Sequence, residues 1–116
     1  MSEEKRYVFK ITDVPLLEDP TKTMQDSVMI TDETCGSTQY TAGLFWLAPH
    51  VAGHGDKHPD QDEVYYIING SGILHLEGEP IALEAGDVVF VPKNQYHSVE
   101  NTGDDLLKLF WAIGEG

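Results

Sequence analysis

The stretch from Pro49 to Gly72, PHVAGHGDKHPDQDEVYYIINGSG, decides the fold, because potential metal-binding side chains are followed directly by an apolar strand and a glycine turn. Imidazole and carboxylate groups are common ligands of divalent transition metals. Val64 to Ile68 consists of β-branched and aromatic side chains, a composition typical of a strand. The stretch therefore predicts a strand with candidate metal ligands at and before its start.

The length of 116 residues and an apolar content of 41% fit one domain with one core, spanning residues 1–116. Within it, residues 1–25 are expected to form an N-terminal strand and loop that could lie at a dimer interface. The strand is expected at Tyr7 to Ile11, and the loop from Val14 to Gln25, which Pro15 and Pro20 interrupt.

The formal charge of -13, from 20 acidic and 7 basic residues, argues against nucleic acid and anionic membranes as partners, because both need a basic surface. A small molecule or another protein is the expected partner. Cys35 is the only cysteine, so no intrachain disulfide can form, and the N-terminal MSEEKRYVFK lacks the apolar stretch of a secretory signal. These features predict a cytoplasmic protein outside the membrane.

Short apolar runs alternate with turn signals along the chain, and nowhere does an apolar period of 3.6 residues persist for three turns. The polar segment from Asp32 to Ser37 is expected to be a turn, and Gly70 to Gly72 is expected to close a hairpin. This pattern predicts an all-β, antiparallel sandwich or barrel. Beyond the N-terminal strand, the expected strands are Ser27–Thr31, Gln39–Leu47, Val64–Ile68, Ile73–Leu76, Ile81–Leu83, Val88–Val91, Tyr96–Val99 and Leu106–Ile113.

Three of the potential ligands could converge in such a barrel. Glu63 begins a strand, His58 precedes it by a short loop, and His97 lies on a later strand after a proline turn. Alternate residues of each strand face the interior of a small barrel, so convergence needs only matching parity and depth. Two imidazoles and one carboxylate with open positions suit one divalent ion of Fe, Mn, Ni or Zn.

The spacing around these residues matches a two-part signature. Its first part, usually written G(X)5HXH(X)3-4E(X)6G, is met by His58, Glu63 and Gly70. At its leading glycine this chain has His50, and at its first histidine it has Asp56. The first part of the signature is therefore matched from His58 onward and altered at the two earlier positions.

The second part, G(X)5PXG(X)2H(X)3N, is met by Gly86, Pro92, His97 and Asn101, with Asn94 where a glycine is usual. Two motifs in order are far more specific than either alone. With both, the chain resembles a small single-domain member of the cupin superfamily. The resemblance implies an antiparallel double-stranded β-helix, or jelly-roll barrel, that holds one divalent metal ion and commonly forms a homodimer.

Carried over position by position, the resemblance implies a metal set of Asp56, His58, Glu63 and His97. Because Asp56 replaces a histidine, three alternatives stay open. Asp56 ligates the ion, His54 reaches in from one strand step away, or three protein ligands hold the ion while Asp56 acts as a base. The candidate catalytic residues are Asp56, His54 and, as a tyrosine expected to face the interior, Tyr65.

Two functions fit these observations. The first is a metalloenzyme of dioxygenase, isomerase, lyase or cyclase type that acts on a small oxygen-bearing organic molecule. The second is a non-catalytic module that binds a metabolite or sugar, with a structural or orienting metal. Family resemblance alone does not choose between them.

Overall fold

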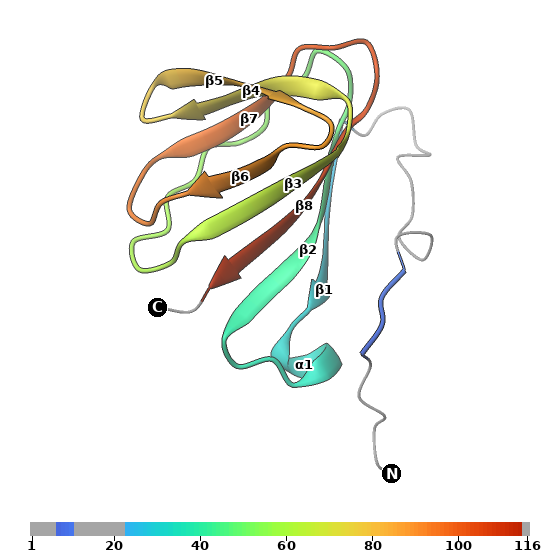
Figure 1. Ribbon diagram of the computed structural model, residues 1–116, viewed down its shortest axis with the longest axis vertical. Coiled ribbons are helices and arrows are strands. Elements are labelled where there is room, and N and C mark those ends of the chain that lie inside the picture. Colours follow the sequence, from blue (N-terminus) through green and yellow to red (C-terminus); the bar gives the residue numbers. More distant parts are fainter. Residues whose placement is uncertain (1–6, 11–22, 115–116) are drawn as a thin grey trace.

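The structure is a computed structural model that describes residues 7–10 and 23–114. Within these residues, eight antiparallel strands form two sheets, one ordered β1-β2-β8-β3-β6 and the other β5-β4-β7 (Figure 1). The all-β jelly-roll prediction is confirmed. No helix of the described part is long and apolar enough to cross a membrane. The elements are β1 (Met24–Ile30), α1 (Asp32–Cys35), β2 (Tyr40–Leu47), β3 (Glu63–Asn69), β4 (Ser71–Leu76), β5 (Glu79–Glu84), β6 (Val88–Val91), β7 (His97–Asn101) and β8 (Leu107–Gly114).

The expected hairpin around Gly70 to Gly72 is wrong, because the strands on either side do not pair. β3 pairs with β6 and β8, whereas β4 pairs with β5 and β7. Gly70, at φ +87°, carries the chain from one sheet to the other, and a Cβ there would lie 2.5 Å from the carbonyl oxygen of Leu106. Only Gly70 lies between the two strands, since Ser71 and Gly72 already belong to β4, and the conformational freedom of glycine does not determine which strands pair.

Three further expectations need correction. Residues 7–10 form no strand, and Ile11, the last residue of that predicted strand, lies outside the described residues. Residues 14–22 of the predicted loop also lie outside them. The last two residues of that loop, Met24 and Gln25, begin β1 instead. The polar segment after β1 is the single helical turn α1. Its capping box explains the helix, since Thr31 Oγ1 accepts from the Thr34 amide while Thr34 Oγ1 accepts from the Thr31 amide.

The core lies between the two sheets, because buried side chains of both sheets form one cluster. Ile67 and Leu109 come from the five-stranded sheet, and Leu74 and Val99 from the three-stranded sheet. Tyr65 points into this interior, as strand alternation requires.

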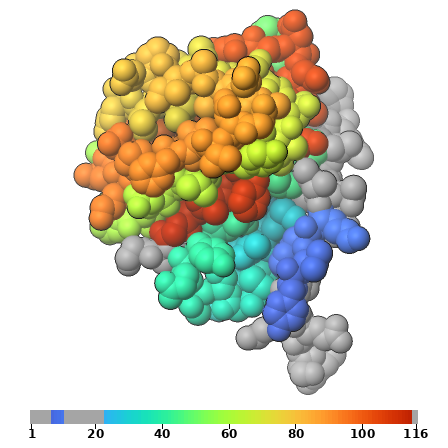
Figure 2. Space-filling model, in the orientation of Figure 1, coloured from blue at the N-terminus to red at the C-terminus, as the bar shows by residue number. Residues whose placement is uncertain are grey.

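The opposite face of the five-stranded sheet is partly uncovered. Residues 7–9 line a groove together with residues of β1, β2, β3 and β8. Figure 2 shows the segment of residues 7–10 (blue) beside β1 (cyan). Toward the other edge of the sheet, large apolar side chains remain exposed. They are Val64, Tyr66, Val88, Phe90 and Phe110.

Asn101, the last residue of β7, connects this strand to β2 and to the turn that follows through side-chain hydrogen bonds. Its side chain is fully buried; Nδ2 donates to the carbonyls of Leu47 at 2.9 Å and Asp105 at 2.8 Å, and Oδ1 accepts from the Gly103 amide at 2.9 Å. One amide group thus satisfies three backbone groups where β2, β7 and the following turn meet. This contact supports the strand that carries His97.

Replacing Asn101 by alanine is therefore expected to lower the free energy of unfolding by about 3 kcal/mol, since buried backbone groups lose their partners. Urea denaturation followed by circular dichroism measures this change. Gln39→Ala, which removes an exposed amide, is the matched control and should change stability by less than about 0.5 kcal/mol. Equal effects of the two substitutions would contradict the role of Asn101.

Candidate metal centre

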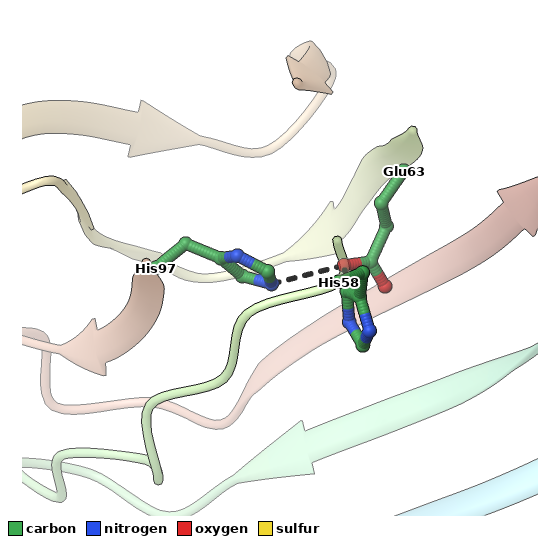
Figure 3. A group of neighbouring side chains, drawn as sticks. All are labelled: His58, Glu63 and His97. Atoms are coloured by element: carbon green, nitrogen blue, oxygen red, sulfur yellow. Dashed lines mark ion pairs between the residues drawn. The ribbon is translucent and has the colours of Figure 1, made fainter. Parts of the chain in front are cut away.

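His58, Glu63 and His97 meet inside the barrel, although they come from three different segments. One potential ligand atom of each lies within 4.8 Å of the others, and Figure 3 shows the three side chains pointing toward one another. Glu63 is 6% exposed and His97 is 4% exposed. A group of this kind could hold a metal ion.

Backbone pairing brings the two histidines together. The segment before β3 runs antiparallel beside β7, where Asp56 and His97 exchange two backbone hydrogen bonds of 2.9 Å. The Asn94 amide also donates to the carbonyl of His58 at 2.7 Å. Glu63 lies on β3 between β6 and β8, so its carboxylate projects from a strand that is paired on both sides.

The contacts within the group are short. Glu63 Oε1 lies 3.1 Å from His97 Nε2 and 3.6 Å from His58 Nε2, and the two imidazole centroids are 5.3 Å apart. His97 Nδ1 lies 3.0 Å from the Gln95 carbonyl oxygen. Because a carbonyl accepts only, Nδ1 carries the proton, and Nε2 of the neutral ring presents its lone pair to the group.

The donor set fits a divalent cation. Glu63 Oε1 is buried, yet none of the described residues directs a well-aligned hydrogen bond at it. A buried carboxylate oxygen without such a partner is costly unless a positive charge lies beside it. Two imidazole nitrogens and one carboxylate oxygen match Fe(II), Mn(II), Ni(II) or Zn(II), so these three residues could hold an ion.

Electrostatics of the group favour a bound positive charge. Burial lowers the pKa of His97, but the Glu63 carboxylate and the Gln95 carbonyl outweigh it and raise that pKa above its ordinary value of 6.5. Burial, followed by the nearby Glu63 carboxylate, raises the pKa of the Tyr65 phenol far above its ordinary value. Tyr65 therefore stays protonated at neutral pH.

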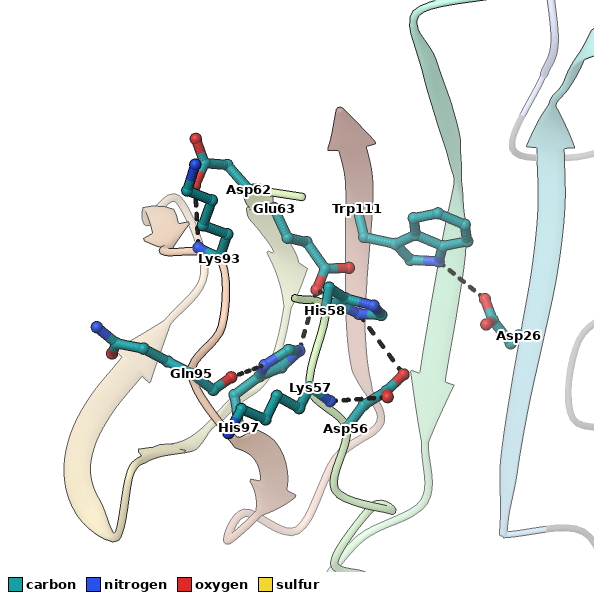
Figure 4. Close-up of polar contacts among 10 residues, drawn as sticks. All are labelled: Asp26, Asp56, Lys57, His58, Asp62, Glu63, Lys93, Gln95, His97 and Trp111. Atoms are coloured by element: carbon teal, nitrogen blue, oxygen red, sulfur yellow. Dashed lines mark hydrogen bonds and ion pairs between the residues drawn. The ribbon is translucent and has the colours of Figure 1, made fainter. Parts of the chain in front are cut away.

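The other predicted site residues lie beside the group without belonging to it. Asp56 Oδ2 is 3.5 Å from His58 Nε2, its side chain is 65% exposed, and Oδ1 accepts from the Lys57 amide at 2.8 Å (Figure 4). His54 is exposed and borders the same cavity. The structure thus brings three of the four expected metal ligands together and places Asp56 and His54 at their margin.

These residues line an open cavity of about 160 Å³, together with the apolar side chains of Phe45, Leu109 and Trp111. Asp26 of β1 also lines the cavity, and Trp111 Nε1 donates to Asp26 Oδ1 at 2.8 Å. Sequence reasoning missed Asp26 because it stands directly after the predicted loop. Only the pairing of Asp26 with Phe45 on β2 reveals that it shares a face with the cavity.

Comparison with known proteins identifies a family profile and several relatives that match the chain. The cupin domain profile matches residues 43–113. An oxalate-binding protein of Thermotoga maritima is 40% identical over 57 residues, which cover 49% of this chain and 47% of that protein. The tetracenomycin polyketide synthase protein TcmJ of Streptomyces glaucescens is 33% identical over 85 residues, covering 73% of this chain and 57% of that protein. The chain thus spans about half the length of these relatives.

A solved structure shows the same architecture over nearly the whole chain. It is an uncharacterized protein with a double-stranded β-helix domain from Klebsiella pneumoniae, which superposes with a TM-score of 0.81. The superposition covers 97% of this chain and 92% of that chain at 17% identity. This likeness concerns the fold alone.

Replacing any one of the three converging residues should lower the affinity for Mn(II) or Zn(II) by at least about 100-fold. Loss of a hydrogen-bond partner of a metal ligand already lowers affinity by up to about 100-fold, and loss of the ligand itself should cost at least as much. His58→Ala, Glu63→Gln and His97→Ala, titrated by calorimetry, measure this effect. Asp56→Asn should change the affinity by less than about tenfold, since Asp56 lies outside the group.

His75→Ala is the matched control, because His75 pairs with Glu100 rather than with the group. It should leave metal affinity unchanged. If Asp56→Asn weakened binding as much as Glu63→Gln, Asp56 would be a ligand and the three-residue arrangement would be wrong.

Metal affinity should also fall as the pH decreases, because protons compete for the same nitrogen and oxygen atoms. The raised pKa of His97 in the metal-free protein means that this competition begins above pH 6.5. Calorimetric titrations between pH 8 and pH 5.5 would show a progressive loss of affinity. An affinity that stayed constant across this range would speak against imidazole ligation.

Proposed function

The chain belongs to the cupin family, and we propose that it is a metal-dependent enzyme acting on a small, uncharged, oxygen-bearing organic molecule. One observation carries the proposal. The buried group of His58, Glu63 and His97 opens into a cavity lined by aromatic and acidic side chains. The reaction would be of the dioxygenase, isomerase, lyase or cyclase type.

The charge of the cavity supports an uncharged ligand. Among the described residues, three carboxylates line it, from Asp26, Asp56 and Glu63, and neither lysine nor arginine does. One divalent ion would leave an excess of negative charge, and the whole chain carries a formal charge of -13. A dianionic ligand would therefore meet repulsion both at long range and inside the site.

The size of the cavity narrows the ligand further. About 160 Å³ is close to the roughly 150 Å³ cavity that accommodates benzene in another protein. A single ring or a short carbon chain fits. Among the relatives, the name of one points to oxalate and that of another to polyketides; the charge and apolar lining support a ketone or enol of the polyketide kind over oxalate.

The residues divide the chemical work as follows. His58, Glu63 and His97 would hold the ion, which supplies Lewis acidity or activates oxygen. Asp56, which is exposed beside His58, is the base that would accept a proton from the ligand, with His54 as the alternative. Tyr65 is buried and stays protonated beside the Glu63 carboxylate, so it would orient that carboxylate by a hydrogen bond rather than remove a proton from the ligand.

The alternative function is that of a non-catalytic binding module, which the name of the oxalate-binding relative favours. Substitution of Asp56, the proposed base, distinguishes the two functions experimentally. Loss of turnover with intact ligand binding in Asp56→Asn supports an enzyme, whereas a wild-type protein that binds ligand without converting it supports the module.

The exposed apolar face over β3, β6 and β8 supports a homodimer as the form in which this enzyme acts. Its exposed members Val64, Tyr66 and Phe90 carry no charge on an otherwise strongly acidic chain. Two copies would meet there with the least repulsion.

A matched pair of ligands tests the charge argument. Acetylacetone and malonate share a three-carbon arrangement of two carbonyl groups, but malonate is a dianion at neutral pH. Calorimetry on the Mn(II)-loaded protein should show acetylacetone binding at least about tenfold more tightly, because malonate meets the acidic lining.

Glu63→Gln serves as the control and should abolish the binding of both ligands together with the metal. Tighter binding of malonate by the wild-type protein would contradict the proposal of an uncharged substrate. Conversion of acetylacetone would be followed in the same samples by its ultraviolet absorbance and by oxygen consumption.

A further inference from the structure

Asp26 provides a second polar side chain in the cavity lining, separate from the three residues that could hold the metal. It lies on β1, opposite Phe45 of β2, which in turn pairs with Leu109 of β8. All three residues line the cavity. Figure 4 shows the Trp111 indole extending from β8 toward Asp26, on the side away from Glu63 and the two histidines.

The hydrogen bond from Trp111 fixes the orientation of this carboxylate. Indole Nε1 donates to Oδ1 at 2.8 Å, and among the described residues no second hydrogen-bond donor to Asp26 is found. The remaining oxygen is thus able to accept. Asp26 lies on the edge strand of its sheet, is exposed to solvent and lines the cavity, so a ligand in the cavity can reach it.

The surroundings of Asp26 are those of a binding group. Partial burial raises the pKa of its carboxyl group, the indole hydrogen bond lowers it, and the negative charge of Glu63 raises it further, with a net increase. A partly desolvated acceptor gains more from a hydrogen-bond donor than one in water does. The apolar side chains of Phe45 and Leu109 beside it would contact a carbon skeleton.

We infer that Asp26 is the second anchor of the ligand, accepting a hydrogen bond from a hydroxyl group at the end remote from His58, Glu63 and His97. This inference rests on the proposed function and names the substrate class more closely. The substrate is a hydroxylated ketone or enol, with carbonyl oxygen toward the histidines and a ring or short chain against Phe45 and Trp111. A ligand without the distal hydroxyl leaves the Asp26 carboxylate unpaired and is bound less tightly.

A purely structural role for Asp26 makes a different prediction. If the carboxylate served only to join β1 to Trp111 of β8, its replacement would affect stability and would weaken all ligands equally. Selective loss of affinity for hydroxylated ligands follows only if Asp26 contacts the ligand.

Two phenolic ketones provide the probes. 2,4-Dihydroxyacetophenone and 2-hydroxyacetophenone have the same oxygen pair at one end, and only the first has a hydroxyl at the other. Calorimetry on the Mn(II)-loaded wild-type protein should show about tenfold tighter binding of the dihydroxy probe, because a hydrogen bond to a charged group is formed.

In Asp26→Asn, whose amide oxygen can still accept from Trp111, the ratio of the two dissociation constants should fall to about one, as it should in Asp26→Ala. Asp104→Asn is the matched control, because it removes one negative charge at a side chain that is 97% exposed and does not line the cavity. This control should keep the wild-type ratio. Manganese content, measured by mass spectrometry, should be the same in all four proteins.

Three results would overturn the inference. A wild-type ratio preserved in both Asp26 variants would show that Asp26 does not bind the hydroxyl. An equal loss of affinity for both probes would assign Asp26 a structural role. If the metal-loaded wild-type protein bound neither probe, the substrate class of the proposed function would itself be wrong, and the role of Asp26 would fall with it.

Discussion

The burial of the Glu63 carboxylate between two imidazoles is the constraint on which the rest of the structure depends. Glu63 lies on β3, which is paired on both sides, and its side chain is 6% exposed. A carboxylate in that position needs a positive charge beside it, which a divalent ion held by the group would supply. The segment carrying His58 supplies one imidazole by pairing along β7, and β7 supplies the other through His97.

The same arrangement connects fold to chemistry. The two sheets close around an apolar core, and at one end of that core the inward-facing side chains become polar. A metal ion held there would face a cavity whose walls are aromatic and acidic. The charge of these walls and the cavity volume of about 160 Å³ restrict the charge and size of the ligand. The fold alone does not, because one fold supports many reactions.

Much of this was predictable from local sequence. Apolar runs predicted the strands, although β1 begins at Met24 rather than at Ser27, and the spacing of His58, Glu63 and His97 predicted their convergence. The pairing of β4 was not predictable, because Gly70 signals a turn and not the partner strand. Asp26 was missed because its face is defined by pairing with Phe45, a contact between segments that no local pattern contains.

The central claim is that His58, Glu63 and His97 together hold one divalent ion, and anomalous diffraction tests it most directly. Crystals of Mn(II)-loaded protein, measured near the manganese absorption edge, should give one strong anomalous peak per chain, bounded by the two Nε2 atoms and the Glu63 carboxylate. A peak elsewhere, or no peak in crystals of fully loaded protein, would contradict the account.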